Sequence, residues 1–94
     1  MVATEDYEIC LVLNPKINSN QRLKELEYCI DTALVANYLG YCICDEFSTL
    51  GFGQISLYCY LESTTKERAE KMIAQVISDN FPTTKVDFME AIRF

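Results

Sequence analysis

Five cysteines and the absence of histidine limit the chemistry that this sequence offers. Cys42 and Cys44 are two residues apart, so on a strand their side chains would share one face. Two thiolates without a nearby histidine or a second cysteine pair make a poor zinc site. An odd number of cysteines without C-x-x-C spacing argues against a disulfide framework. We expect the cysteines to act as small hydrophobic residues, and we expect neither a metal nor a cofactor.

The residue combinations that support catalysis are also missing from the sequence. There is no histidine to act as a general base and no glycine-rich loop to hold a phosphate. Cys44 is followed by Asp45 and Glu46, whose carboxylates would disfavour the reactive thiolate form. We therefore expect that the protein is not an enzyme.

The hydrophobic pattern predicts the elements that position the remaining residues. Alternating apolar residues predict strands, and apolar residues at three- and four-residue steps predict amphipathic helices. Asn18 or Asn20 is expected to cap the first helix, Gly40 to follow its end, and Thr64 with Glu67 to form a capping box for the second. The predicted strands cover 7–13, 41–47, 54–62 and 84–94, and the predicted helices cover 20–39 and 64–80. Residues 89–94 also fit a helical turn.

The resulting βαββαβ order predicts one ferredoxin-like α+β domain over residues 1–94. In this fold a four-stranded antiparallel sheet of order 4-1-3-2 carries both helices on one face. Strand alternation places Ile9, Leu11, Ile55 and Leu57 toward the helices. The other face is then predicted to hold Glu8, Cys10, Val12, Cys42, Cys44, Glu46, Gln54, Ser56, Tyr58, Tyr60, Glu62, Lys85, Asp87 and Met89.

Gly51-Phe52-Gly53, at the entry to the third strand, resembles the start of the RNA-recognition-motif signature. That family has the same βαββαβ order, so the resemblance implies a sheet that stacks RNA bases on aromatic side chains. The chain departs from the signature at basic and aromatic positions, where it has Leu50, Gln54, Leu57 and, on the first strand, Cys10. These departures count against RNA binding.

The charge distribution also disfavours a nucleic-acid partner. The chain has a net charge of −6. The helical segments are nearly balanced, whereas the other segments hold eight acids against three bases. The acid excess thus lies on the sheet, where phosphates would be repelled. Acids interleaved with tyrosines suit a basic protein partner instead. The candidate partner-binding residues are Glu8, Asp45, Glu46, Tyr58, Tyr60, Glu62 and Asp87.

Size, acidity and missing catalytic residues are typical of bacterial immunity proteins and antitoxins, which neutralise basic, nuclease-like toxins. We expect a role of this kind. Two alternatives remain open: an ACT-like small-molecule-sensing or structural homodimeric domain, and an RNA-recognition-motif-like RNA binder. No apolar run approaches the roughly 18 residues of a membrane span. The first eight residues carry acids where a secretory signal carries positive charge, so a cytoplasmic location without membrane contact is expected.

Overall fold

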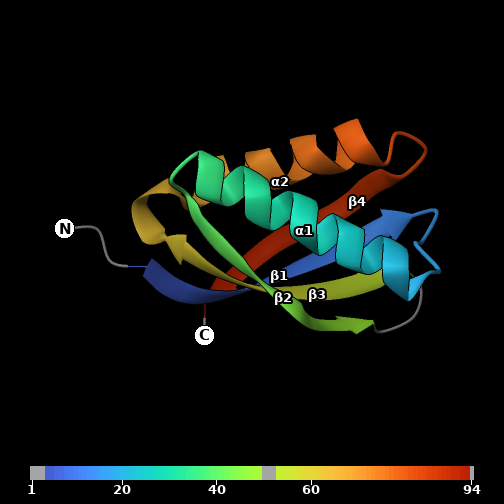
Figure 1. The fold of residues 1–94 in the computed structure, drawn as a ribbon, viewed down its shortest axis with the longest axis horizontal. Coiled ribbons are helices and arrows are strands. Elements are labelled where there is room, and N and C mark those ends of the chain that lie inside the picture. The colour runs from blue at the N-terminus through green and yellow to red at the C-terminus, as the bar shows by residue number, and fades with distance from the viewer. Residues whose placement is uncertain (1–3, 50–52, 94) are drawn as a thin grey trace.

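A four-stranded antiparallel sheet with two helices on one face forms the framework of the protein (Figure 1). The computed structural model describes residues 4–49 and 53–93, with the backbone alone at 44–49 and at residue 63. The elements are β1 (Thr4–Asn14), α1 (Asn20–Ala36), β2 (Gly40–Thr49), β3 (Gln54–Glu62), the short 3₁₀ helix η1 (Ser63–Thr65), α2 (Lys66–Asn80) and β4 (Lys85–Arg93). The strand order β2-β3-β1-β4 confirms the predicted ferredoxin-like arrangement. The last segment is a strand through Arg93, and neither described helix is long and apolar enough to cross a membrane.

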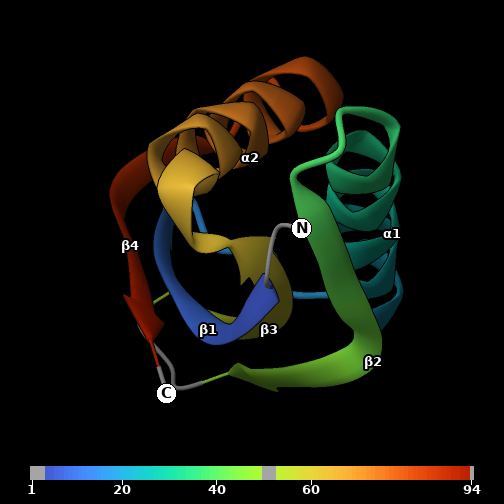
Figure 2. The same ribbon diagram turned by 90° about the vertical axis from the view of Figure 1, so that its left-hand side faces the viewer.

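The core lies between the sheet and the helices, with α2 toward β1 and β4 and α1 beside β2 (Figure 2). Odd-numbered residues of β1 and β3 point toward the helices and are buried, because alternate side chains of a strand share a face. The predicted core residues are all buried: Ile9, Leu11, Leu23, Leu26, Ile30, Ile55, Leu57, Ala69, Ile73 and Val76.

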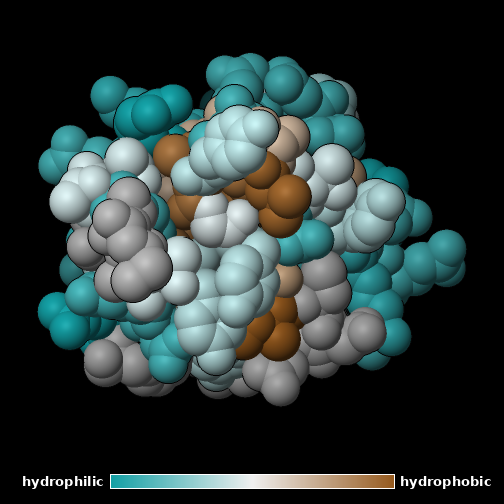
Figure 3. All heavy atoms as spheres, turned by 60° about the vertical axis from the view of Figure 1, so that its left-hand side comes forward, coloured by the Kyte–Doolittle hydropathy of each residue, from teal (hydrophilic) through white to brown (hydrophobic). Residues whose placement is uncertain are grey.

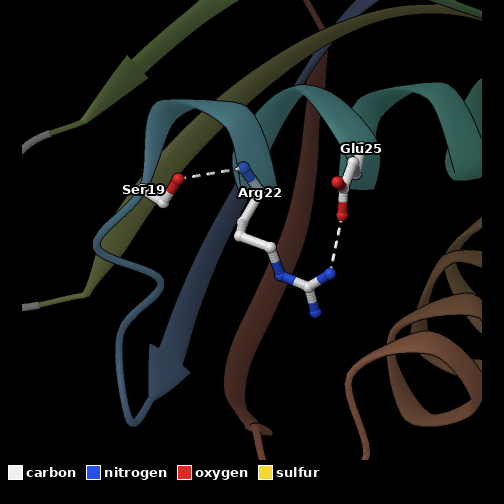
Figure 4. Close-up of polar contacts among 3 residues, drawn as sticks. All are labelled: Ser19, Arg22 and Glu25. Carbon is white, nitrogen blue, oxygen red and sulfur yellow. Dashed lines mark hydrogen bonds and ion pairs between the residues drawn. The ribbon is translucent and has the colours of Figure 1, made fainter.

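The start of α1 is joined to the end of α2 through one arginine. Ser19, rather than Asn18 or Asn20, caps the helix, and its Oγ accepts a hydrogen bond from the Arg22 backbone N–H at 3.4 Å (Figure 4). The Arg22 guanidinium pairs with Glu25 at 2.6 Å. It also lies 4.4 Å from the ring centroid of Phe81, the buried residue that follows α2. This cation–π contact links the two helices at one end of the molecule.

A tyrosine occupies the left-handed position after α1. Tyr38 has φ +57°, its N–H donates to Val35, and the Leu39 N–H donates to Leu34 O at 2.9 Å. These bonds form the Schellman motif, in which glycine is the usual left-handed residue. The expectation that Gly40 fills this position is therefore wrong. Gly40 has φ +137° at the start of β2, where a Cβ would lie 2.0 Å from the Tyr60 carbonyl oxygen.

Register shifts in β2 and β4 change which side chains face the helices. Four residues of β2, 43–46, lie opposite the single residue Tyr58, and β2 bends near this bulge (Figure 2). Cys42 pairs with Cys59 on the helix-facing side and is buried, so its predicted place on the opposite face is wrong. In β4, Asp87 is the extra residue of a smaller bulge. Met89 consequently pairs with Leu11 and packs against the core, which corrects its predicted place as well.

Truncating a core residue on either helix should destabilise the protein. Leu26 and Ile73 are fully buried, so we expect Leu26→Ala and Ile73→Ala each to lower the free energy of unfolding by about 2–5 kcal/mol. Urea denaturation measures this loss. Val35→Ala is the control, because Val35 lies on α1 with 54% of its surface exposed. Equal midpoints for all three variants would contradict the assignment of the helix faces.

Replacing Tyr38 with glycine should stabilise the protein. Its side chain is 93% exposed and contributes little packing, while its backbone conformation is unfavourable for any residue with a Cβ. After allowance for the greater freedom of glycine in the unfolded chain, we expect Tyr38→Gly to gain about 0.5–1 kcal/mol. Tyr28→Gly, inside α1 and also exposed, should instead cost about 0.5 kcal/mol. A loss of stability in both variants would refute the strain at Tyr38.

Candidate functional site

The face of the sheet opposite the helices is the candidate functional surface, and we call it the open face. No described helix covers it (Figure 2). It is defined by the even-numbered residues of the two central strands and by their cross-strand neighbours. Those whose side chains the structure describes are Thr4, Asp6, Glu8, Cys10, Val12, Asn14, Tyr41, Gln54, Ser56, Tyr58, Tyr60, Glu62, Lys85, Phe88, Glu90 and Ile92.

Three tyrosines form a continuous group at one end of the open face. Tyr41 of β2 and Tyr60 of β3 are direct cross-strand partners, and their rings stack with centroids 4.9 Å apart at an interplanar angle of 26°. Tyr58 lies two residues from Tyr60 and therefore on the same face. Tyr41 is 44% exposed, whereas Tyr58 and Tyr60 are half-buried. Stacking holds these amphipathic rings in place before any partner arrives.

Acidic side chains of β1 run alongside the tyrosines. Asp6 lies opposite Tyr60, and Glu8 lies opposite Tyr58. Further along, Glu90 of β4 lies opposite Cys10. Within the described part of the chain, none of these three carboxylates has a basic partner, because Arg93 pairs with Glu5 at 3.0 Å. The open face thus presents an uncompensated negative stripe beside an aromatic one.

Apolar side chains complete the open face on the side of β4. Phe88 is 48% exposed and Ile92 is 45% exposed, and their cross-strand partners are Val12 and Glu8. Figure 3 looks toward the end of the molecule that is at the left of Figure 1, and small apolar areas, drawn brown, lie there among pale, weakly polar residues and teal, hydrophilic ones. A mixture of aromatic, apolar and charged groups is typical of protein interfaces rather than of a fully solvated surface.

Cys10 lies on the open face, opposite Ser56 of β3 and Glu90 of β4. Partial burial raises the pKa of its thiol, and the nearby charges of Glu8 and Glu90 raise it further. A hydrogen bond with Ser56 acts in the opposite direction. The thiol is therefore protonated at neutral pH and is a poor nucleophile.

Six of the seven predicted partner-binding residues fall into three groups. Glu8, Tyr58 and Tyr60 lie together on the open face, as expected. The backbone of 45–46 belongs to the bulge opposite Tyr58, and the side chains of Asp45 and Glu46 lie outside the described structure. Asp87 is exposed but belongs to the β4 bulge, beyond the Val12–Phe88 pair and away from the tyrosines.

Glu62 has a structural role that the sequence pattern did not indicate. Its carboxylate accepts hydrogen bonds from the backbone N–H of Thr64 at 2.9 Å and from the Thr64 hydroxyl at 2.6 Å. This side chain caps η1, whereas Thr65, the residue before α2, makes no side-chain capping bond. The predicted capping box of Thr64 with Glu67 is therefore wrong. The bonds from Thr64 lower the pKa of Glu62 below its ordinary value.

Tyr41, Asp6, Glu90, Phe88 and Ile92 belong to the open face but were not among the predicted binding residues. Strand alternation puts Cys42 on the open face and therefore its neighbour Tyr41 on the helix-facing side. Both assignments are wrong because the β2 bulge is not evident from the sequence. Phe88 and Ile92 were missed for the same reason in β4. Asp6 could have been found from alternation in β1, since it precedes Glu8 by two residues.

A small cavity lies at the other end of the sheet, near the loop after β1. Its volume is about 210 Å³, and its lining includes Lys16, Asn18, Asn20 and Gln54. Sites for drug-sized ligands usually occupy about 300–1,000 Å³ and are largely apolar. This cavity is smaller, and its four polar side chains are exposed or half-buried, so it supports a small-molecule site less well than the open face supports a protein partner.

The capping role of Glu62 should make stability depend on pH. Because the folded protein lowers the pKa of Glu62, its stabilising effect is present above the ordinary carboxyl pKa and is lost as pH falls through the lowered value. We expect Glu62→Gln to unfold at lower urea concentration than the wild type at neutral pH. The difference should shrink below about pH 4. Glu67→Gln, an exposed acid in the first turn of α2, is the control. A pH-independent difference would contradict the capping role.

Comparisons with known proteins do not assign the chain to a family. A scan against protein-family models gives no match, and a search of curated proteins finds no significantly similar sequence. The arguments for function therefore rest on the geometry and charge of the open face.

Proposed function

We propose that this protein is a non-catalytic binding module that holds a basic protein partner against its open face. The observation that carries this proposal is the pairing of Asp6 and Glu8 on β1 with Tyr60 and Tyr58 on β3. In the more specific form of the proposal, the protein is cytoplasmic and acts as a bacterial immunity protein or antitoxin that sequesters a nuclease-like toxin.

The two stripes of the open face favour a basic protein for different physical reasons. Unpaired carboxylates attract a positively charged partner and accelerate its encounter. Tyrosines bury a large contact area with few rotatable bonds, and such residues often dominate the dissociation rate. The stacked Tyr41 and Tyr60 lose little further freedom on binding, because they already restrict each other.

Nucleic acid fits this face less well than a basic protein does. Phosphate groups would approach Asp6, Glu8 and Glu90, whereas Lys85, a base of the described open face, lies opposite Asn14 at the far end of β1. Aromatic stacking with bases, worth about 1–3 kcal/mol per base, would have to overcome that repulsion. The RNA-binding alternative is therefore the weaker one.

A homodimer through the open face is the second candidate, and exposed Phe88 and Ile92 favour it. In a twofold dimer, however, each copy presents the same patch to the other. The stripe formed by Asp6, Glu8 and Glu90 would then lie close to its own copy, and like charges across an interface are unfavourable. A partner of opposite charge avoids this repulsion.

Charge reversal on the open face should weaken capture of the partner. We expect Asp6→Lys/Glu8→Lys to slow association about tenfold or more, and the slowing should diminish as salt rises. Tyr60→Ala should speed dissociation, with a loss of about 1–4 kcal/mol in binding. The measurement is affinity capture from a lysate of the source cell with immobilised wild type and variants, followed by mass spectrometry and kinetics on the recovered basic protein.

Glu67→Lys/Asp79→Lys is the matched control, because it makes the same change in net charge on exposed residues of α2. It should recover as much partner as the wild type. Equal recovery by both double variants would refute the open-face site, as would a captured protein that is acidic. Recovery of further copies of this chain alone, with the tyrosines buried between them, would establish the homodimer instead. Urea midpoints of all variants verify that each one is folded.

A further inference from the structure

Two buried cysteines face each other across β2 and β3. Cys42 and Cys59 are direct antiparallel partners, and both side chains lie on the helix-facing side of the sheet. Cys42 is 4% exposed and Cys59 is 1% exposed. Neither forms a disulfide in this structure. Nothing in their role as core residues requires that two sulfur atoms occupy opposite positions of one pair.

The hydrogen bonds around this pair show that its backbones approach closely. The Glu62 N–H donates to Leu39 O at 3.2 Å, which makes Gly40–Leu61 a non-hydrogen-bonded pair. Because the two kinds of pair alternate, Cys42–Cys59 is also non-hydrogen-bonded, and the Cys42 N–H instead donates to Asp31 Oδ1 at 3.0 Å. Cα atoms in such pairs are about 4.5 Å apart. A disulfide needs about 4.4–6.8 Å.

We propose that Cys42 and Cys59 are a redox-active dithiol that closes to a cross-strand disulfide on reaction with a low-molecular-weight disulfide such as oxidised glutathione. One cysteine thiolate attacks a glutathione sulfur, forms a mixed disulfide and releases one glutathione thiolate. The second cysteine, as its thiolate, attacks the protein-side sulfur of the mixed disulfide and releases the second glutathione. The protein dithiol is oxidised by two electrons, and glutathione disulfide is reduced to two thiols.

The position of the pair gives the reagent a route to the buried sulfur atoms. Cys42 is the last regularly paired residue of β2 before the bulge at 43–46, and β2 is an edge strand. Local opening at a sheet edge beside a bulge breaks few hydrogen bonds, so it is less costly than global unfolding. The closed disulfide would fix the ladder beside the bulge, next to the stacked Tyr41 and Tyr60.

The test treats the purified, reduced full-length protein with oxidised glutathione without air and digests it under non-reducing conditions with a protease that cleaves after acidic residues. Cleavage after Asp45 or Glu46 separates Cys42 from Cys59, so the disulfide joins two peptides. We expect an intact mass lower by two hydrogen atoms and a peptide pair linked through Cys59. The oxidised protein should also unfold at a higher urea concentration, since the link closes a loop in the unfolded chain.

Cys44 shares its peptide with Cys42, so variants identify the linked residue. Cys44→Ala should retain the linked pair, and Cys42→Ala and Cys59→Ala should each lose it. Cys29→Ala is the matched control, because Cys29 is a half-buried cysteine of α1. Only glutathione adducts in the wild type, or a linked pair that survives in Cys42→Ala, would overturn the proposal. The peptide map of Cys44→Ala, in which Cys42 is the single cysteine of its peptide, decides the question even if a core variant fails to fold.

Discussion

The packing of the odd-numbered residues of β1 and β3 against α1 and α2 is the interaction on which the rest of the structure depends. Ile9, Leu11 and Leu57 are completely buried in that layer, and the two central strands hold both edge strands in place. Because side chains alternate along a strand, burial of the odd-numbered residues in the core leaves the even-numbered residues on the open face. Asp6, Glu8, Tyr58 and Tyr60 are therefore held as a group by the same packing that stabilises the fold.

The edge strands adapt to this central pair by changing register. The bulge in β2 inserts 43–46 opposite Tyr58, so the strand keeps Tyr41 stacked on Tyr60 and still pairs its far end with β3. Asp31 of α1 accepts the hydrogen bond of the Cys42 N–H at the bulge, which leaves one fewer backbone donor free at the sheet edge. The β4 bulge at Asp87 similarly turns Phe88 toward the open face.

The element order, the helix faces and the faces of β1 and β3 could be predicted from the sequence, because alternation and helical periodicity continue there without interruption. Which residues of β2 and β4 face the helices could not be predicted, since each bulge adds an odd number of residues and inverts the alternation beyond it. Cys42, Met89 and Asp87 were misassigned for this reason. Glu62 was a reasonable binding candidate by position, yet its carboxylate is engaged by Thr64, an interaction that no charge pattern reveals. Tyr38 similarly takes a backbone conformation for which Gly40 was the better chemical candidate.

We propose that the surface left uncovered by the helices is the one that meets the partner. Hydroxyl-radical footprinting of the tyrosines, in the free protein and in its complex with the captured basic protein, locates the binding surface. Tyr28 on the outer side of α1 is 67% exposed and provides the internal reference for Tyr41 on the open face, which is 44% exposed. We expect binding to protect Tyr41, Tyr58 and Tyr60 while oxidation of Tyr28 is unchanged. Protection of Tyr28 with unchanged oxidation of the three sheet tyrosines would contradict it.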